Sequence, residues 1–373
     1  MGISAKLGFK YFRSKKGFFV SFTSFMAIAG LTVGVATLII VMSVMNGFER
    51  ELQNRILGVI PHALIHSREP IDKYDELIEE ILKVNQVEEA VPFIQMQSLI
   101  SNGKESRGVL LTAVDPQYEK NVSILEDHMK TGSISNLQSG QIIIGFWLAA
   151  YLGVSVGDEI SILTSEVRTS LLGSFPRSFT FKVSGIFELK AEPDQNLVII
   201  SHDDGQKIKN YDNQTQSIRL KVSDVMQSRQ IASETVFKIS NANTSYASST
   251  WEKTHGTLFQ AVQLEKLIIG LLLFLIVGVA AFNILSTTVM SVKTKEKEIA
   301  IMKTIGIPDK TLVGIFIFQG LYISLIGISL GLILGLITTI NLNSIILLIE
   351  TMFDRTLLDA YFINYFPYYI DIS

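Results

Sequence analysis

The chain of 373 residues contains no cysteine. This absence excludes a disulfide framework, a thiol nucleophile, a thiolate metal site and lipidation on cysteine. Charged residues are also scarce, at 18%, whereas a soluble domain usually carries about 25%. The net charge of −3 gives no indication of nucleic-acid binding. Together with 48% hydrophobic residues, the shortage of charge indicates a membrane protein.

Catalytic motifs are missing as well. The sequence holds no phosphate-binding loop of the G-x-x-x-x-G-K-[ST] type, no H-E-x-x-H and no G-x-S-x-G. His62 and His66 could share a helix face as metal ligands, but the segment around them has the pattern of a strand and favours two surface histidines. The acidic clusters 192–194 and 202–204 are expected to be solvated turns. The sequence therefore predicts neither a catalytic nor a metal site.

Three apolar runs are each longer than the roughly 20 residues that cross a bilayer as a helix. They predict membrane spans at 18–46, 267–292 and 311–340. A basic leader, 1–17, precedes the first span. Because the apolar part is too long for a cleaved signal peptide, a retained span is predicted.

The distribution of lysine predicts how these spans are oriented. Five lysines lie in the loop 293–310, whereas the tail 341–373 is acidic. The positive-inside rule therefore places the leader and this loop in the cytoplasm, and residues 47–266 and the tail outside. The start of the tail, 341–353, is expected to form an interfacial helix.

Residues 47–266 predict an external α+β domain, because helical and strand patterns are mixed without regular βαβ alternation. Helices are expected at 71–84, 146–152 and 222–240, and a polar linker at 241–250 precedes the second span. Short strands are expected at 107–114, 141–144, 159–163, 178–187, 197–200 and 217–222.

Glycines recur every four residues in two spans. They are Gly30 and Gly34, and Gly327, Gly331 and Gly335. Small residues let helix backbones approach closely in lipid, so this spacing predicts a tightly packed bundle, formed either within the chain or between two protomers. Chance spacing is the alternative, since glycine is common in membrane spans.

Two further segments are candidates for binding a partner. The loop 293–305 carries an apolar stripe formed by Ile299, Ile301, Met302 and Ile305. This stripe either docks into a groove of another protein or rests on the bilayer. In a predicted hairpin, the loop 170–177 exposes apolar side chains, which either mark a binding site or fold back on their own domain.

The order of span, large external domain, span, short basic loop and span resembles the FtsX/MacB-type membrane subunits of ABC transporters. The closest likeness is to the lipoprotein-releasing permeases of the LolC/LolE/LolF group. The stretches that carry the resemblance are VMSVMNGFERELQNRILGVIPHALI (41–65), WLAAYLGVSVGDEISIL (147–163), LFQAVQLEKLIIGLLLFLIVGVAAFNI (258–284) and KEIAIMKTIGI (297–307). The likeness runs along essentially the whole chain.

This resemblance implies a fold and a function. The fold is an α-helical transmembrane protein with a large α+β periplasmic domain between spans 1 and 2, in porter-like and sabre-like parts. The function is that of a non-catalytic permease subunit that extracts lipoproteins from the outer leaflet of the Gram-negative inner membrane. The expected partners are a LolD-type ATPase, a second permease subunit, a LolA-type periplasmic carrier, the lipoprotein cargo and membrane lipids. The chain itself is expected to bind no cofactor, with ATP and Mg on the ATPase.

The resemblance also implies two contact sites. The loop after the second span is similar to the coupling helix that docks on the ATPase, and its expected contacts are Glu298, Ile299, Met302 and Gly306. The hairpin is similar to the hook with which LolC- and LolF-type subunits grip the carrier. Its expected contacts are Leu171, Leu172, Gly173, Phe175, Pro176, Arg177 and Ser178.

A third site is expected where lipid enters. We expect acyl chains to enter a cleft formed by the outer ends of the first two spans. Its lining is expected to be Met42, Val44, Met45 and Phe48, with Leu264, Leu267 and Ile268 opposite. Methionine suits this task because it is unbranched and repacks around varied lipids. Ordinary helix packing is the alternative for the two methionines.

The sequence departs from the family pattern in one respect. The family has a fourth span, and we expect that span to be missing here, because the sequence stops where it would start. The tail looks more like the LolE pattern, whereas the hook favours a LolC-like or LolF-like subunit. The rival functions are a MacB-type efflux or mechanotransmission permease and an FtsX-like anchored regulator without a transported substrate. An anchored hydrolase is disfavoured by the missing motifs.

Overall fold

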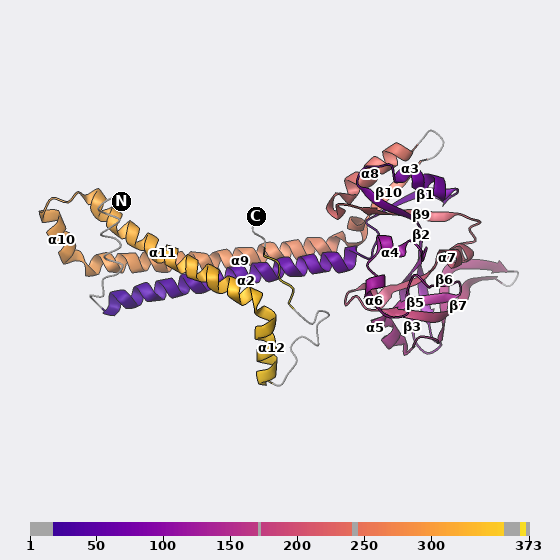
Figure 1. Ribbon diagram of the computed structural model, residues 1–373, viewed down its shortest axis with the longest axis horizontal. Helices are drawn as coiled ribbons and strands as arrows, with labels where there is room; N and C mark the ends of the chain where they lie inside the picture. The colour runs from indigo at the N-terminus through magenta and orange to yellow at the C-terminus, as the bar shows by residue number, and fades with distance from the viewer. Residues whose placement is uncertain (1–17, 171–172, 241–244, 354–365, 371–373) are drawn as a thin grey trace. The chain divides into compact units, whose positions relative to one another are not determined.

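The computed structural model describes residues 18–170, 173–240, 245–353 and 366–370 (Figure 1). The chain divides into two compact units. The helical unit comprises Met1–Arg50 and Gln260–Ser373, and the sheet unit comprises Glu51–Phe259. Both boundaries fall inside helices, α2 (Phe18–Leu57) and α9 (Trp251–Thr294), so each of these helices contributes residues to both units.

The helical unit contains three helices that are long and apolar enough to cross a membrane, by length and composition. They are α2 from Ser24 onward, α9, and α11 (Asp309–Ile340). The short helix α10 (Glu296–Thr304) connects α9 to α11, and α12 (Leu342–Phe353) follows α11. The three predicted spans lie within these helices. α2 and α9 are longer than their apolar runs, because the polar segments after residue 46 and before residue 267 continue the helices.

Three glycines of α11 pack directly on α2. They are Gly327, Gly331 and Gly335, and all are buried. A Cβ atom added at Gly331 would lie 2.7 Å from Cβ of Val35 and 2.8 Å from the carbonyl oxygen of Thr32. The Thr32 hydroxyl also donates a hydrogen bond to the carbonyl oxygen of Gly327, at 3.2 Å. This stripe therefore packs two helices of the same chain, which confirms the predicted close packing, whereas a contact between two protomers stays a prediction.

α9 completes the helical unit. A Cβ atom at Gly34 of α2 would lie 3.6 Å from the side chain of Ile276 of α9, which is ordinary van der Waals contact. Gln319 of α11 and Ser291 of α9 are both buried, and their side chains are hydrogen-bonded to each other at 3.1 Å. Hydrogen bonds of this kind between helices stabilise the association of the helices in lipid.

The first part of the sheet unit follows a βαββαβ order. Its elements are β1 (Ala63–Ile71), α3 (Tyr74–Ile81), β2 (Val87–Ser101), β9 (Thr215–Val222), α8 (Ser228–Ile239) and β10 (Ala247–Thr250). The strands pair antiparallel in the order β10-β1-β9-β2, which is the ferredoxin-like arrangement. α3 and α8 lie together on this sheet (Figure 1), and one apolar core joins them to it. We call this the ferredoxin-like part.

The second part, residues 94–214, comprises the second half of β2 and the chain between β2 and β9, and it forms a closed barrel. Its further strands are β3 (Ser106–Val114), β4 (Met129–Thr131), β5 (Gln141–Gly145), β6 (Glu159–Ser170), β7 (Gly173–Phe187) and β8 (Leu197–Ser201). The pairs β2-β3, β3-β8, β8-β5, β5-β7, β7-β6 and β6-β2 close a ring of six strands, and β4 pairs with β7. Alternate apolar residues of all six strands meet in one core. A closed barrel leaves no free edge strand among the six.

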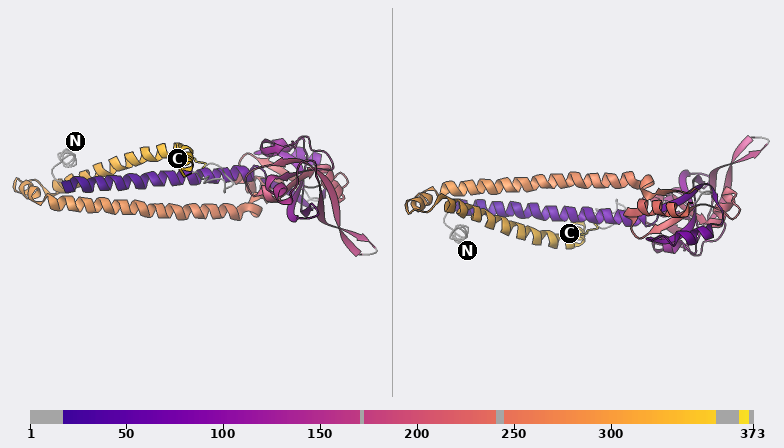
Figure 2. Two further views of the ribbon diagram at one scale, coloured as in Figure 1. Left: turned by 90° about the horizontal axis from the view of Figure 1, so that it is seen from below. Right: turned by 90° about the horizontal axis from the view of Figure 1, so that it is seen from above.

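Helices and one long hairpin surround the barrel. α5 (Phe146–Leu152) and α7 (His202–Lys209) contribute side chains to the barrel core. The short elements α4 (Glu119–Val122), η1 (Glu126–His128), α6 (Pro193–Asn196) and η2 (Val225–Gln227) lie in the connections. β6 and β7 continue beyond the barrel as a hairpin that projects from the rest of the sheet unit (Figure 2).

The predicted fold class, a helical transmembrane protein with an α+β domain between the first two spans, is confirmed. The six predicted strands and the helix 146–152 are present, and Gly153 ends that helix with φ 63°. Two predictions are wrong. The polar linker extends too far, because its last four residues form β10. The loop 170–177 is not a loop throughout, because β6 and β7 pair as far as Ser170 and Gly173.

Candidate functional site

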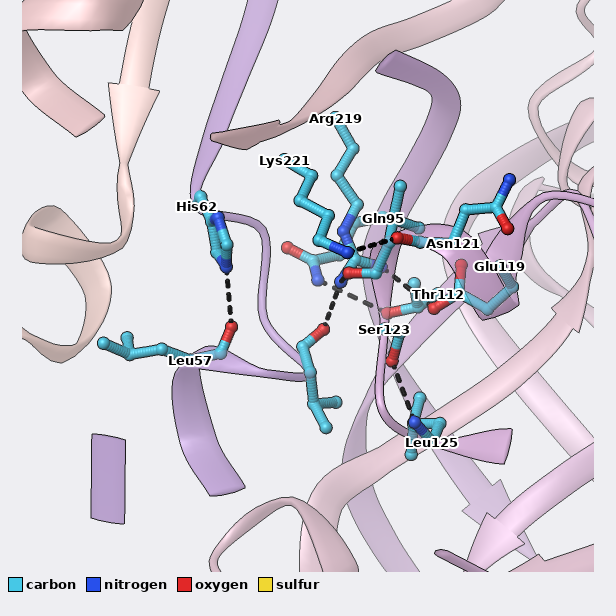
Figure 3. A network of polar contacts seen from close by, with 12 residues as sticks. Leu57, His62, Gln95, Thr112, Glu119, Asn121, Ser123, Leu125, Arg219 and Lys221 are labelled. Carbon is cyan, nitrogen blue, oxygen red and sulfur yellow. Dashed lines mark hydrogen bonds and ion pairs between the residues drawn. The ribbon is translucent and has the colours of Figure 1, made fainter. Parts of the chain in front are cut away.

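A buried arginine fixes the chain that follows α2 (Figure 3). The guanidinium of Arg219 in β9 forms an ion pair with Glu119 of α4 at 3.0 Å, and the two side chains are only 3% and 2% exposed. The same group donates hydrogen bonds to the carbonyl oxygens of Val59 at 2.7 Å and Val122 at 3.2 Å. Burial raises the pKa of the Glu119 carboxyl, and the charge of Arg219 opposes this shift. We call these residues, together with His62, the stalk junction.

His62 extends the stalk junction to both long helices. Its Nε2 donates to the carbonyl oxygen of Leu57 at 3.1 Å (Figure 3), and its Nδ1 accepts from the backbone N–H of Val222 at 3.2 Å. The backbone N–H of Trp251, the first residue of α9, donates to the carbonyl oxygen of His62 at 3.2 Å. Burial and the nearby charge of Arg219 lower the pKa of His62 to about 4. His62 therefore joins three elements: its neutral imidazole bonds to the end of α2 and to β9, and its backbone carbonyl bonds to the start of α9.

The prediction of two surface histidines is wrong for His62, which is 9% exposed, whereas His66 is half-buried in β1. His202 is buried too, with Nε2 lying 3.2 Å from the Thr215 hydroxyl oxygen, and burial lowers its pKa. In the part of the chain that the structure describes, no group of three or more His, Asp or Glu side chains could hold a metal ion.

The two acidic clusters are not solvated turns. Asp194 is fully buried and accepts hydrogen bonds from the backbone N–H groups of Leu189 at 2.8 Å and Lys190 at 2.7 Å. Burial raises the pKa of Asp194. Asp204 accepts from the Ser139 hydroxyl and from a backbone N–H, and these bonds outweigh burial and lower its pKa. Both carboxylates therefore lie inside the fold as hydrogen-bond acceptors, whereas Glu192 and Asp203 of the same clusters are exposed.

The residues predicted to line a lipid cleft differ in exposure between α2 and α9. Met42, Val44 and Met45 are half-buried on α2, and Phe48 is 38% exposed. On α9, the three predicted residues point away from the helix bundle and are 61%, 67% and 49% exposed; they are Leu264, Leu267 and Ile268. Lys266 between them forms an ion pair with Glu49 of α2 at 2.9 Å, which fixes the outer ends of the two helices side by side.

A strap formed by residues 366–370 covers the outer end of α2. The backbone N–H of Tyr369 donates to the carbonyl oxygen of Ser43 at 2.9 Å, and the guanidinium of Arg50 lies 4.5 Å from the centre of the Tyr369 ring. A Cβ atom at Gly47 would come within 2.6 Å of the strap backbone at Pro367 and Tyr368. Glycine is therefore required there, and the strap contacts α2 at Ser43 and Gly47, within two residues of Met42 and Met45.

The predicted coupling segment forms α10 between α9 and α11. The side chain of Glu298 is 51% exposed and forms an ion pair with Lys295 at 3.2 Å. Of the predicted contacts, Ile299 and Met302 are half-buried, and Gly306 is exposed with φ 91°. The most exposed apolar residues are instead Ile301 at 59% and Ile305 at 74%. These two residues share a helix face with Glu298, and both belong to the apolar stripe that the sequence predicted for this loop.

The predicted hook coincides with the β6–β7 hairpin. Leu171 and Leu172 lie outside the described residues, and Gly173 and Phe175 belong to β7. Pro176 and Ser178 are exposed. Arg177 is half-buried, because its guanidinium donates to the carbonyl oxygen of Ile208 and to the Asn210 side chain, at 3.2 and 3.0 Å. Arg177 thus fixes the base of the hairpin to the end of α7.

Two sequence profiles match this chain. The MacB-like periplasmic core domain matches residues 24–236, and the FtsX-like permease C-terminal region matches residues 270–371. Together they define a membrane permease with a periplasmic domain inserted after its first span. The chain is also similar to the periplasmic region of MacB from Actinobacillus actinomycetemcomitans, at 11% identity over 56% of this chain and 97% of that one, with a TM-score of 0.35.

Sequence relatives define the family more narrowly. The lipoprotein-releasing system transmembrane protein LolC of Xylella fastidiosa is 34% identical over 98% of this chain and 89% of the relative. LolC of Neisseria meningitidis serogroup B is 32% identical over 100% and 91%, and LolE of Haemophilus influenzae is 30% identical over 97% and 88%. The chain therefore belongs to the LolC/LolE family of lipoprotein-releasing system transmembrane proteins. The resemblance inferred from the sequence is confirmed.

Proposed function

We propose that this chain is the permease subunit of an ABC transporter that extracts lipoproteins from the outer leaflet of the inner membrane of a Gram-negative bacterium. The observation that carries the proposal is the similarity to LolC-type proteins over nearly the whole chain. The proposed topology has the N-terminus and α10 in the cytoplasm and the sheet unit in the periplasm. The basic loop 293–310 supports this orientation.

The energy for extraction is proposed to come from a separate ATPase. Removing acyl chains from a bilayer costs about 0.8 kcal/mol per CH₂ group, so a lipoprotein with several chains needs an external energy source. The ATPase is proposed to dock on α10 through Glu298, Met302, Ile301 and Ile305. The exposure of the two isoleucines supports this surface. Ile299 and Gly306 flank it.

The path from the membrane to the carrier is proposed to run through the sheet unit. Acyl chains would enter beside Met42, Val44, Met45 and Phe48, near the outer face of α9. The β6–β7 hairpin would bind the periplasmic carrier. β2 supports this arrangement, because it pairs with β9 at the stalk junction and with β6 at the base of the hairpin. A single strand thus connects the stalk junction to the β6–β7 hairpin.

One reconstitution tests the proposal. The chain, its ATPase and any second permease subunit are placed in liposomes with a fluorescent triacylated lipoprotein, and ATP-dependent transfer to a soluble carrier is measured. Met45→Asp is expected to abolish transfer and Met45→Leu to retain it, because leucine keeps the apolar surface. Leu171→Asp combined with Leu172→Asp is expected to abolish carrier binding, whereas Thr180→Asp, exposed on β7 outside the hook, is not.

The same assay separates the rival functions. ATP hydrolysis stimulated by a small-molecule substrate without lipoprotein transfer would favour a MacB-type efflux permease. ATP hydrolysis that responds to no substrate would favour an FtsX-like regulator. Normal lipoprotein transfer by the Met45→Asp variant would refute the proposed entry site while leaving the transporter assignment intact.

A further inference from the structure

An apolar groove of about 630 Å³ lies beside the coupling helix, within the helical unit. Its walls come from the C-terminal part of α9, the N-terminal part of α11, and α10. The side chains that matter here are Ala281, Leu285, Ile299, Val313 and Ile317. A volume between about 300 and 1,000 Å³ is typical of a site for a small organic ligand.

The groove has the length of one membrane leaflet. Its walls extend from Ala281 to Val292 on α9 and from Asp309 to Gly320 on α11. At 1.5 Å of rise per residue, each wall is about 16 Å long. Half of a bilayer's hydrocarbon thickness is about 15 Å. A single extended acyl chain therefore matches the groove from the helix ends to the middle of the bilayer.

The interior of the groove offers nothing to a polar ligand. Thr288, a polar side chain of its lining, donates its hydroxyl to the carbonyl oxygen of Ile284 in its own helix, at 2.9 Å. Charge appears only at the mouth, where Lys303 forms an ion pair with Asp309 at 2.8 Å and both side chains are more than half exposed. Exposed pairs of this kind are worth little, so the lysine can exchange its partner.

The surroundings of the mouth favour an anionic headgroup. The loop 293–310 contains five lysines against three acidic residues. Lys293 and Lys310 are exposed near the C-terminal end of α9 and the N-terminal end of α11, the two helices that form the walls of the groove. Basic residues beside a membrane span attract anionic lipids by about 1 kcal/mol each.

We propose that this groove binds one acyl chain of an anionic phospholipid from the leaflet next to α10, with the headgroup held by Lys293, Lys303 and Lys310. The proposal rests on the chain lying in a bilayer and does not depend on what it transports. Because Ile299 of α10 forms part of the wall, the bound lipid would also hold α10 against the two spans. Occupancy would therefore fix the position of the surface proposed to meet the ATPase.

Photocrosslinking tests this site in the full transporter. The complex is placed in nanodiscs of phosphatidylethanolamine that contain a small fraction of phosphatidylglycerol with a diazirine in its acyl chain, and adducts are mapped by mass spectrometry. We expect adducts to concentrate in 281–292 and 309–320. Ala281→Phe fills the inner end of the groove and should lower the yield of these adducts about tenfold. A loss of this size is expected when about two methylene groups of the acyl chain lose their contact with the groove. Val279→Phe, 71% exposed on the same helix outside the groove, should leave the yield unchanged.

Further variants alter the opposite wall of the groove and the lysines proposed to hold the headgroup. A Cβ atom at Gly320 would lie 3.6 Å from the Thr288 hydroxyl oxygen, so Gly320→Val fills the groove from the opposite wall and should act like Ala281→Phe. Lys303→Gln combined with Lys310→Gln should remove the preference for phosphatidylglycerol over an equally labelled phosphatidylethanolamine. Adducts spread evenly over all exposed helix faces would overturn the site. Equal labelling by both lipids in the wild type would refute the preference for an anionic headgroup. Adducts on a segment of another protein that fills the groove would refute a lipid as its occupant.

Discussion

Protonation of His62 is predicted to weaken the sheet unit at mildly acidic pH. In the folded chain, Nδ1 accepts a hydrogen bond from the backbone N–H of Val222, and Nε2 donates to Leu57. A proton on Nδ1 would turn this acceptor into a donor that faces another donor. It would also place a positive charge in a buried site near Arg219. Both effects favour the neutral imidazole in the folded state.

The size of the effect follows from the pKa shift. The pKa of His62 is about 4 in the folded chain and about 6.5 when unfolded. Because the folded pKa is the lower one, the contribution to stability is complete above pH 6.5 and is lost as the pH falls toward 4. The free energy of unfolding should therefore decrease by about 2 kcal/mol between pH 7.5 and pH 5, and by about 3 kcal/mol below pH 4.

Tryptophan fluorescence provides a suitable assay. The chain has two tryptophans, Trp147 and Trp251, and both lie in the sheet unit, so the signal reports on that unit. For a urea slope of about 2 kcal/mol per molar, the wild-type midpoint should fall by about 1 M more than that of His62→Gln between pH 7.5 and pH 5. His66→Gln, a half-buried control in β1, should behave like the wild type. Equal decreases in the wild type and His62→Gln would refute this reasoning.

Two other perturbations test the packing of each unit. Glu119→Ala should lower the free energy of unfolding of the sheet unit by about 3–5 kcal/mol in the same urea titration, because it leaves Arg219 buried without its partner. Glu119→Leu with Arg219→Met should lose much less, and additive losses would contradict a direct ion pair. Gly331→Ile should destabilise the helical unit by about 1–3 kcal/mol, because its Cβ meets the Thr32 carbonyl oxygen, and this loss should appear as a lower thermal midpoint of the detergent-solubilised chain. Gly278→Ile, where a Cβ meets nothing within 4 Å, is the control.

Elements with one buried face could be predicted from the sequence. α5 consists entirely of apolar and aromatic residues, buries Leu148, Ala149 and Leu152, and ends at Gly153, a residue that adopts a positive φ easily. The three spans could be recognised because uncharged runs of this length are rare outside membrane-spanning helices. The glycine spacing correctly indicated close packing. It could not name the partner helix, because a glycine stripe fits any neighbour that approaches it.

The stalk junction was missed because its residues are far apart in the sequence. Glu119 and Arg219 are separated by 100 positions, and each looks like an ordinary surface charge in its own segment. The strand pattern pointed the other way: Ile218 and Leu220 are fully buried, so Arg219 between them falls on the opposite face, where a surface charge is expected. In the fold that face is covered as well, and a buried arginine needs a buried partner. Only the fold shows that Glu119 is that partner.

β2 shows why one strand escaped prediction altogether. Its 15 residues, VEEAVPFIQMQSLIS, contain Pro92 in the interior and alternate in burial only in the second half. The first half pairs with β9 in the ferredoxin-like part, and the second half pairs with β3 and β6 in the barrel. Each sheet buries a different face, so between Ala90 and Ile94 every side chain is buried and the period of two disappears. Because β2 contributes to two cores that bury opposite faces, its sequence lacks the alternation that would have identified it as a strand.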